Sequence, residues 1–218
     1  MDPEAGSGLN DRLAGYYERM LAEREGTERV DWHDRASQFR SFAAVSEVFR
    51  AHRGTVDVYE VGCGMGDMDD YLAANVQDYA YSGCDISSEM VAQAKALRPH
   101  LTIESRDILR DLPPSHDYVV GSGLFTDRSV STDAEWSAFI RSMLPRMFEI
   151  CRIGMASTFL TSKVDFRTEG NYYQSPEEML SFAQSELSRF AEIRHAYFPW
   201  EFTLIVYRNA VPYDAHTA

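Results

Sequence analysis

A glycine-rich loop between a predicted strand and a predicted helix constrains the fold of this chain most. Residues 55–61 are rich in β-branched residues and lead into Gly62-Cys63-Gly64-Met65-Gly66, after which residues 68–75 have the pattern of a short helix. Glycines at such a junction allow positive φ and let the backbone approach a ligand closely. A glycine loop alone is weak evidence of a ligand site, so its neighbours in the sequence must decide.

The rest of the chain alternates between strand and helix patterns. Strands are predicted at 55–61, 79–84, 101–105, 117–121, 153–160, 189–197 and 202–207, and helices at 68–75, 87–98, 132–151 and from residue 175. Strands separated by helices favour a mostly parallel sheet that is covered on both faces. A short turn precedes the last strand, which we therefore expect to be antiparallel to its neighbour. These patterns predict an α/β, Rossmann-like fold with a seven-stranded sheet.

Two amphipathic helices are predicted before the first strand, one starting at Leu9 and one over residues 34–52. The chain of 218 residues is long enough for one domain with a sizeable core. We expect a flexible tail at residues 1–8, an N-terminal helical cap at 9–53 and a Rossmann-like core at 54–218.

Composition narrows the function classes. The net charge of −13 argues against a nucleic-acid partner, because binding a phosphate backbone requires a basic surface. No stretch approaches the roughly 20 apolar residues that span a bilayer, and the polar, acidic first ten residues do not resemble a signal peptide. The number of cysteines is odd, since the chain has only Cys63, Cys84 and Cys151, and this suits buried, reduced thiols rather than a disulfide framework. We expect a cytoplasmic protein, either a monomer or a homodimer.

Acidic residues stand at the ends of the first three predicted strands. Glu60 precedes the glycine loop, where its charge would repel a pyrophosphate but suits a cationic amino-acid moiety. Asp85 ends the next strand, where a carboxylate can accept hydrogen bonds from two ribose hydroxyls. Asp107 follows the third strand, and Asp67 stands where the dinucleotide-binding fingerprint has its last glycine. The pattern predicts a site for a cationic nucleoside at the carboxyl edge of the sheet.

Four segments resemble motifs of the class I methyltransferases that depend on S-adenosylmethionine (SAM), namely residues 58–67, 83–90, 105–108 and 117–125. The resemblance extends over residues 55–207 and implies that SAM is the cofactor. It implies that Gly62 and Gly64 line the methionine part and that Asp85 binds the ribose. The other cofactor-binding residues that it implies are Ile86 and Met90 against the adenine, Asp107 with the neighbouring Ile108 at the adenine amino group, and Gly121 and Ser122 beside the sulfonium.

The fourth of these segments also argues against two kinds of methyltransferase. Enzymes that methylate base amino groups typically carry an Asn or Asp, two prolines and an aromatic residue there, whereas this chain has Gly121-Ser122-Gly123-Leu124. Metal-dependent catechol enzymes place a carboxylate near that strand end, and none occurs here before Asp127. The resemblance therefore implies a metal-independent enzyme that does not act on nucleobases.

Two cations after the fifth predicted strand suggest the chemistry of the methyl acceptor. Lys163 and Arg167 are expected near the carboxyl edge, where they would favour a small anionic substrate with a phosphonate or carboxylate oxygen. Tyr17 and His33 of the helical cap are further candidates for contact with this acceptor. The chain as a whole resembles small-molecule enzymes of actinobacterial secondary metabolism, among them a phosphonate O-methyltransferase, which suggests antibiotic biosynthesis.

Other interpretations remain open. In one, Gln38 or Arg40 holds the carboxylate of the cofactor itself. In another, the acceptor is a neutral hydroxyl or an amine, and His33 or His195 removes its proton. A third is a module that binds the cofactor without catalysis, although no feature of the sequence favours it.

Overall fold

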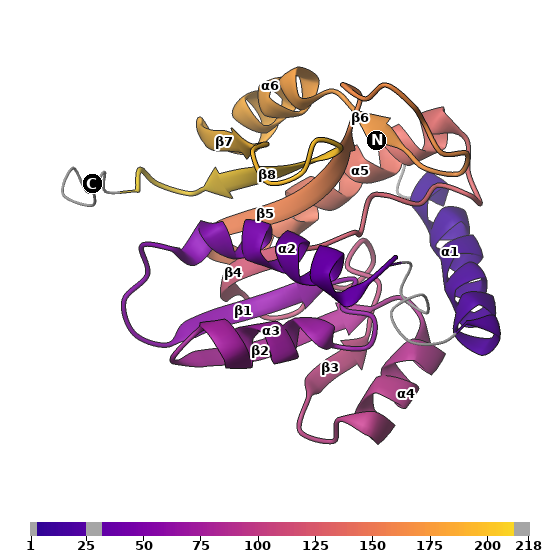
Figure 1. Ribbon diagram of the computed structural model, residues 1–218, viewed down its shortest axis with the longest axis horizontal. Helices are drawn as coiled ribbons and strands as arrows, with labels where there is room; N and C mark the ends of the chain where they lie inside the picture. The colour runs from indigo at the N-terminus through magenta and orange to yellow at the C-terminus, as the bar shows by residue number, and fades with distance from the viewer. Residues whose placement is uncertain (1–3, 25–31, 212–218) are drawn as a thin grey trace.

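The computed structural model describes residues 4–24 and 32–211, and they form one sheet with helices packed around it (Figure 1). The strands run in the order β3-β2-β1-β4-β5-β8-β7, and a short strand, β6, pairs with β5 outside this path. The strands are β1 (Val56–Val61), β2 (Tyr79–Asp85), β3 (Thr102–Ser105), β4 (His116–Gly121), β5 (Cys151–Thr161), β6 (Tyr173–Gln174), β7 (Phe190–Arg194) and β8 (Glu201–Tyr207). The α/β fold class is confirmed.

The sheet has one strand more than we predicted. β6 contains only two residues, Tyr173 and Gln174, and pairs in parallel with the end of β5. A two-residue strand is too short to show the alternation by which strands are detected in a sequence. All seven predicted strands are present, and β8 is antiparallel to both β5 and β7.

The strand order places the ligand site. β1 pairs in parallel with β2 on one side and with β4 on the other. The chain adds β2 and β3 on one side of β1 and then β4 and β5 on the other, so the strand order reverses between β1 and β4. In open α/β sheets of this kind, ligands bind outside the carboxyl ends of the strands at such a reversal. The glycine loop follows β1 and therefore lies at this point.

Helices cover both faces of the sheet. They are α1 (Glu4–Glu23), α2 (Arg35–Ser46), α3 (Asp67–Asn75), α4 (Ser88–Leu97), α5 (Asp133–Glu149) and α6 (Pro176–Glu186). Phe42 of α2 and Leu72 of α3 share one hydrophobic cluster with Val58 and Ile205 of the sheet. The α5 and α6 helices contribute to a second cluster, which includes Leu144 and Met179.

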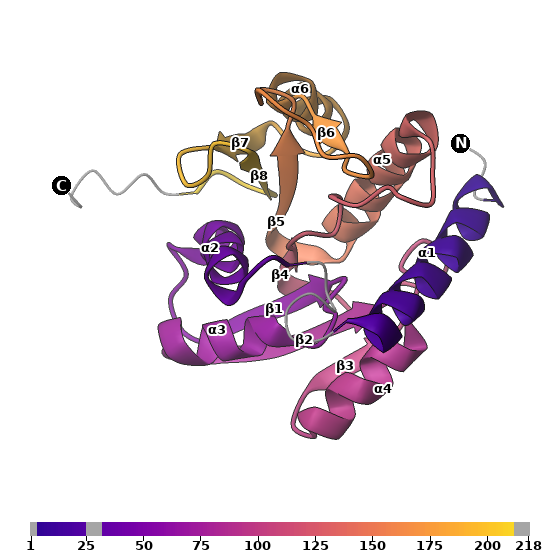
Figure 2. The same ribbon diagram turned by 45° about the vertical axis from the view of Figure 1, so that its right-hand side comes forward.

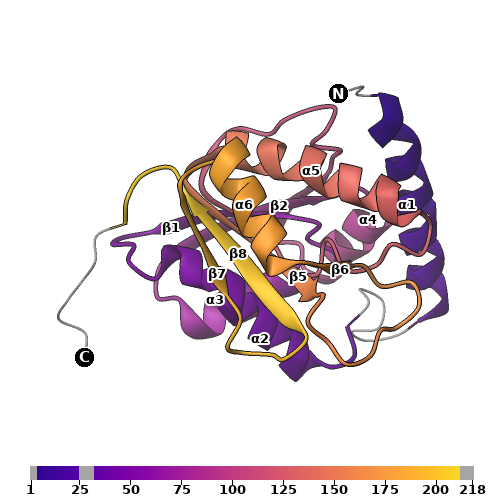
Figure 3. The same cartoon turned by 90° about the horizontal axis from the view of Figure 1, so that it is seen from above.

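The two N-terminal helices have different positions. α1 crosses the carboxyl edge of the sheet between α4 and α5 (Figure 2), and the view from above shows it at one end of the molecule (Figure 3). α2 lies instead against the sheet and shares its hydrophobic cluster. The boundary that we predicted at residue 54 therefore separates α2 from strands against which it packs.

The ends of several helices agree with the sequence patterns. Ser87 and Ser175 cap α4 and α6, and Thr132 forms a capping box with Glu135 at the start of α5. The N-terminus differs, because α1 already begins at Glu4, within the segment 1–8 that we predicted to be a flexible tail. Residues 1–3 lie outside the described residues.

The second predicted helix is shorter than expected. α2 ends at Ser46, a 3₁₀ helix covers Glu47–Phe49, and a turn follows. Within the described residues, every helix is too short or too polar to cross a membrane.

Candidate active site

A cavity of about 980 Å³ opens at the carboxyl edge of the sheet. Its walls come from α1, α2, the glycine loop, the ends of β1, β2, β4 and β5, and the segments around residues 166–173 and 198–201. The volume is at the upper end of the range for pockets that hold a cofactor-sized ligand.

The glycine loop forms the floor of one half of this cavity, the cofactor half. Gly62, Gly64 and Gly66 all have positive φ, at 74°, 52° and 74°. A Cβ atom on Gly62 would lie only 2.8 Å from Leu124 Cδ1. The positive φ favours glycine at this position, and a larger residue would also have to displace the Leu124 side chain. Gly62 and Gly64 line the cavity.

Asp85 holds the loop in place from the end of β2. Its Oδ2 accepts a hydrogen bond from the amide of Gly64 at 2.9 Å, and its Oδ1 accepts one from the amide of Ser87, also at 2.9 Å. Burial raises the pKa of this carboxyl group, although the backbone donors lower it. Asp85 lines the cavity, so its remaining lone pairs can accept from the hydroxyls of a ribose.

Glu60 is a buried carboxyl group beneath the loop. Only 2% of its surface is exposed, and the Tyr81 hydroxyl donates to its Oε2 at 2.6 Å. Burial raises the pKa of Glu60 to about 8, and the nearby carboxylates of Asp67 and Asp85 add to this shift. An ammonium group bound beside Glu60 would favour the ionised form of this carboxyl group, because its positive charge would balance the negative charge of the carboxylate.

Two buried polar atoms in the cavity wall lack a hydrogen-bond partner among the described residues. They are Ser122 Oγ, after β4, and Asp107 Oδ2, after β3. Arg110 Nε lies 3.4 Å from the latter but makes no hydrogen bond to it. Buried polar groups in folded proteins are nearly always paired, so these two atoms mark places for polar atoms of a ligand. They fit SAM, whose adenine amino group can donate to Asp107.

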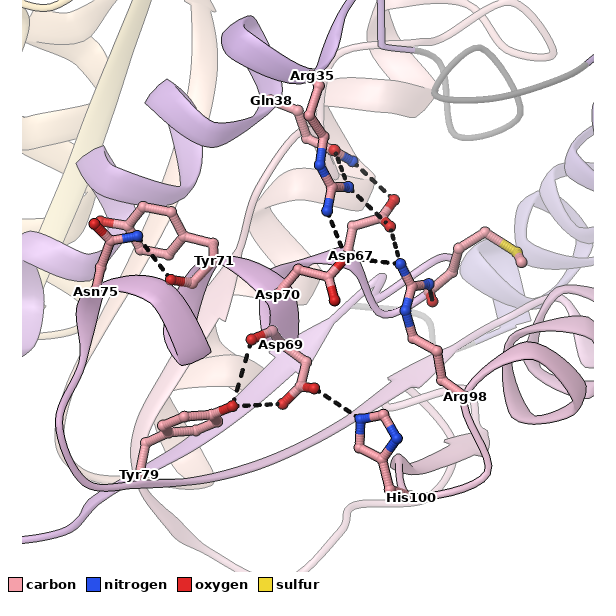
Figure 4. A network of polar contacts seen from close by, with 11 residues as sticks. Arg35, Gln38, Asp67, Asp69, Asp70, Tyr71, Asn75, Tyr79, Arg98 and His100 are labelled. Carbon is pink, nitrogen blue, oxygen red and sulfur yellow. Dashed lines mark hydrogen bonds and ion pairs between the residues drawn. The ribbon is translucent and has the colours of Figure 1, made fainter.

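A polar network joins α2 to the cofactor half (Figure 4). The Gln38 amide donates to Asp67 Oδ2 at 3.1 Å, directly after the glycine loop. Arg98 donates to Asp67 and Asp70 at 2.8 Å each, and Arg35 pairs with the same two carboxylates. Asp67 therefore connects α2, α3 and the turn after α4.

The structure separates the two residues considered for the cofactor's carboxylate. Gln38 lines the cavity, whereas Arg40 is exposed and its guanidinium lies 4.6 Å from the centroid of the Phe198 ring. Gly121 also lies outside the cavity lining, because the space at its Cα is closed by Leu124 and Met147. The predicted contacts Ile86, Met90 and Ile108 do line the cavity.

The predicted acceptor residues divide in the same way. Tyr17 and His33 line the cavity. Lys163 does not, because its ammonium pairs with Glu177 at 2.9 Å, on the surface. The Arg167 guanidinium lies over the ring of Tyr173, 5.2 Å from its centroid, and is likewise outside the lining. The segment that carries these two cations does contribute other residues to the cavity lining, namely Val164, Phe166 and Thr168. The sequence could not show in which direction the Lys163 and Arg167 side chains point.

His195 also lies away from the cavity. Its ring packs edge-on against Phe202, and the residue is exposed. All three cysteines are free and buried, and burial raises the pKa of Cys84 to about 12 and that of Cys151 to about 11. The prediction that the thiols are buried is confirmed, and their raised pKa values disfavour the reactive thiolate form.

The remainder of the cavity, which we call the acceptor half, is lined by residues that were not among the predicted site residues. They are mainly aromatic and aliphatic, with a few polar groups: Trp32, Leu160, Val164, Phe166, Asn171, Tyr173, Phe198, Trp200 and Glu201. They come from four separate segments, so neither periodicity nor spacing along the chain could have grouped them.

The fold and the cradle around the glycine loop define a Rossmann-like, SAM-binding site of class I. Comparison with known proteins gives the family. Residues 58–146 match the model of a methyltransferase domain. Rv1506c of Mycobacterium tuberculosis (strain ATCC 25618 / H37Rv), named as a methyltransferase, is 33% identical over 152 residues, which are 68% of this chain and 91% of the relative. The chain belongs to the SAM-dependent methyltransferase family.

Solved structures show the same fold at low identity. The complex of DhpI, a dehydrophos methyltransferase, with SAM and HEP has a TM-score of 0.60 and 18% identity, over 91% of this chain and 97% of DhpI. The N-methyltransferase NodS from Bradyrhizobium japonicum WM9, in complex with S-adenosyl-L-homocysteine (SAH), has a TM-score of 0.63 and 14% identity, over 89% and 97%. Both structures hold SAM or SAH, which agrees with SAM as the cofactor, and NodS is named as an N-methyltransferase.

Proposed function

We propose that the chain transfers the methyl group of SAM to a hydroxyl or amine of a small, largely apolar molecule. The observation that carries this proposal is the lining of the acceptor half. Its walls are formed mainly by Trp32, Leu160, Val164, Phe166, Phe198 and Trp200. An apolar acceptor would gain about 25 cal/mol for each Å² that it buries against them.

The rim of the acceptor half is also apolar. Phe166 is 75% exposed and Trp200 is 43% exposed, and both line the cavity. The Trp200 ring stacks on that of Phe198, with 4.7 Å between the centroids. Exposed aromatic groups beside a cavity are typical of ligand-binding surfaces, and they supply flat faces for a ring-containing acceptor.

The charges of the cavity argue against an anionic acceptor. Its acidic lining residues are Asp34, Glu60, Asp67, Asp85, Asp107 and Glu201, while Arg106 and His33 are its basic ones. The Arg106 guanidinium already pairs with Glu104 and Asp111. The carboxylates of the cofactor half favour the cationic cofactor, and within the described lining only His33 is left as a basic group for an anionic acceptor. A phosphonate or carboxylate acceptor, which we first predicted, has less support.

His33 remains a candidate for contact with the acceptor, since it lines the cavity. The predicted role in antibiotic biosynthesis and the predicted cytoplasmic location stay predictions.

The chemistry requires little from the protein beyond alignment. SAM supplies a methyl group that its sulfonium already activates. Side chains that fix the acceptor beside it can contribute about 7–11 kcal/mol through proximity and orientation. The apolar walls also exclude water, which would otherwise compete for the acceptor's polar groups.

A matched panel of acceptors tests the proposal. Phenols, aromatic amines, and carboxylates and phosphonates on the same rings are incubated with SAM, and SAH formation is measured by mass spectrometry. We expect turnover with the neutral compounds and less than a tenth of that rate with the anions. Turnover only with the anions, reduced at least tenfold by Lys163→Ala or Arg167→Ala, would establish the anionic acceptor instead.

A further inference from the structure

A buried carboxyl group faces the acceptor half of the cavity. Glu201 is the first residue of β8 and only 4% of its surface is exposed, yet it contributes to the cavity lining. It is separate from the carboxylates of the cofactor half, which stand on β1, α3, β2 and the segment after β3. Buried carboxyl groups are rare unless they are paired or functional.

The partners of Glu201 are neutral hydroxyl groups. Ser41 Oγ, on α2, donates to Glu201 Oε1 at 2.5 Å. The Tyr197 hydroxyl also interacts with this carboxyl group, and it makes a 2.8 Å hydrogen bond with Thr203 Oγ1. Hydroxyl donors stabilise the carboxylate without neutralising its charge. Glu201 is therefore held in position while it keeps the ability to take up a proton.

The register of the sheet places Glu201 beyond the carboxyl end of β4, on the side where the cavity lies. It pairs with Leu160 of β5, three residues beyond Ser157, which pairs with Gly121 at the end of β4. At about 3.3 Å per residue, Glu201 stands roughly 10 Å beyond the end of β4, on the side where the cavity opens. Leu160 and Trp200 line the cavity beside it.

The protonation of Glu201 suits an exchange of protons near neutral pH. Burial raises its pKa to about 7, and the hydroxyls of Ser41 and Tyr197 lower the pKa by a smaller amount. A group whose pKa lies near the working pH is the most effective general base.

We propose that Glu201 is the catalytic base that removes the proton of the methyl acceptor. This inference rests on the proposed function. The acceptor's oxygen or nitrogen forms the new bond to the methyl carbon, and the carbon–sulfur bond breaks with its electron pair left on sulfur. The proton of the acceptor moves to Glu201 and later to water. The acceptor is therefore an O–H or N–H compound.

Two features distinguish Glu201 from His33 as the base. His33 is exposed and lies next to the N-cap residue of α2, whereas Glu201 lies inside the cavity wall. A carboxylate also attracts a protonated amine, which a histidine would repel once it is charged. A carboxylate acceptor would bring no proton at neutral pH, and either a carboxylate or a phosphonate would meet the charge of ionised Glu201.

The test uses Glu201→Gln in the full chain, with an acceptor found in the panel. We expect kcat/KM to fall about 100-fold, because general bases contribute about 10²–10⁴-fold. The wild-type rate should rise with pH through about 7, and this rise should disappear in the variant. SAH affinity by calorimetry should stay within twofold. Glu201→Asp should recover part of the activity and keep the pH dependence.

Glu177→Gln is the matched control, because that carboxylate is exposed and pairs with Lys163 on the surface. It should leave both activity and pH profile unchanged. Activity within threefold of wild type in Glu201→Gln, or an unchanged pH profile, would overturn the proposal. Loss of the pH-dependent rise in His33→Ala would assign the base to the histidine instead.

A second measurement judges the proposal if no acceptor in the panel reacts, an outcome that would count against the proposed function. The ¹³C resonances of the glutamate carboxyl groups are followed with pH in the SAH complex, and Glu201→Gln identifies the signal. Titration near pH 7 would support the proposed base. Titration near pH 4.5, the ordinary range, would overturn it.

Discussion

The two halves of the cavity are built in different ways. In the cofactor half, each key carboxylate has partners: Asp85 holds two backbone amides, Glu60 accepts from Tyr81, and Asp67 binds Gln38, Arg35 and Arg98. In the acceptor half, aromatic faces predominate and polar anchors are few. One half is fixed by directional bonds, and the other by shape and apolar surface.

This difference corresponds to what each half must recognise. A single cofactor with fixed charges can be matched by a fixed set of hydrogen bonds, each of which is costly to lose when buried. An apolar surface is non-directional and accepts related molecules with small changes in affinity. We therefore expect substitutions in the cofactor half to have large effects on SAH binding and those in the acceptor half to have small ones.

Asp85→Ala should produce the largest effect. The change removes the acceptor of the Gly64 and Ser87 amides and the group that faces the ribose. Hydrogen bonds to a charged group contribute about 1.5–3 kcal/mol each, so SAH affinity should fall about 10²–10³-fold by calorimetry. Asp78→Ala, at an exposed carboxylate before β2, is the control and should leave SAH affinity unchanged. A loss of less than tenfold in Asp85→Ala would contradict the role assigned to this residue.

Glu60→Gln should weaken SAH binding about tenfold while stabilising the empty protein. The pKa of Glu60 is about 8 in the folded chain and 4.5 ordinarily. The folded state therefore holds the proton more tightly, and the stability that this provides is lost as pH rises from about 4.5 to 8. Glutamine cannot ionise, so the variant should have the higher Tm above pH 8, by about 2–4 °C for each kcal/mol. Calorimetric scans at pH 5, where the two proteins should differ little, and at pH 8.5 check this.

The same carboxyl group predicts that cofactor binding depends on pH. Because the ammonium of SAH favours ionised Glu60, binding below pH 8 should release a proton. Titration calorimetry in buffers with different ionisation enthalpies measures this release. Equal heats in all buffers at pH 7 would mean that Glu60 does not change its charge on binding.

Arg98→Ala should have an intermediate effect. Arg98 donates to Asp67, Asp70 and the carbonyl oxygen of Met65, so it supports the glycine loop from outside the cavity. We expect SAH affinity to fall about threefold and the free energy of unfolding to fall by about 1–2 kcal/mol. Arg189→Ala, at an exposed arginine, should change neither quantity in calorimetry and urea unfolding. An unchanged SAH affinity in Arg98→Ala would mean that the loop keeps its shape without this support.

Phe166→Ala should have the smallest effect on the cofactor. The ring is largely exposed at the rim of the acceptor half. SAH affinity should stay within twofold, while the KM of an aromatic acceptor should rise about threefold through lost apolar contact. A larger change in SAH affinity than in KM would show that the two halves are not separate.

The sequence predicted the cofactor half far better than the acceptor half. Gly62, Gly64 and Asp85 lie within or beside two loops that directly follow strands, so local patterns and the order of strands were enough to place them. Gly121 was also predicted, but it lies outside the cavity lining, because Leu124 and Met147 close the space beside it, which the sequence does not show.

The acceptor half depends on side-chain directions and on contacts between distant segments. Lys163 was predicted to face the substrate, but its partner Glu177 follows only after the intervening loop and β6. Glu201 contacts Ser41, which is 160 residues away in the chain. Long-range contacts of this kind leave no periodic signal in a single sequence, which is why these residues emerged only from the fold.

A crystal structure with SAH tests the division of the cavity most directly. We predict the ribose hydroxyls within hydrogen-bond distance of Asp85, the adenine amino group at Asp107 Oδ2, and the sulfur atom directed toward the side of the cavity lined by Leu160, Trp200 and Glu201. SAH bound with its sulfur directed away from these residues, or with its adenine in the aromatic half, would contradict the account.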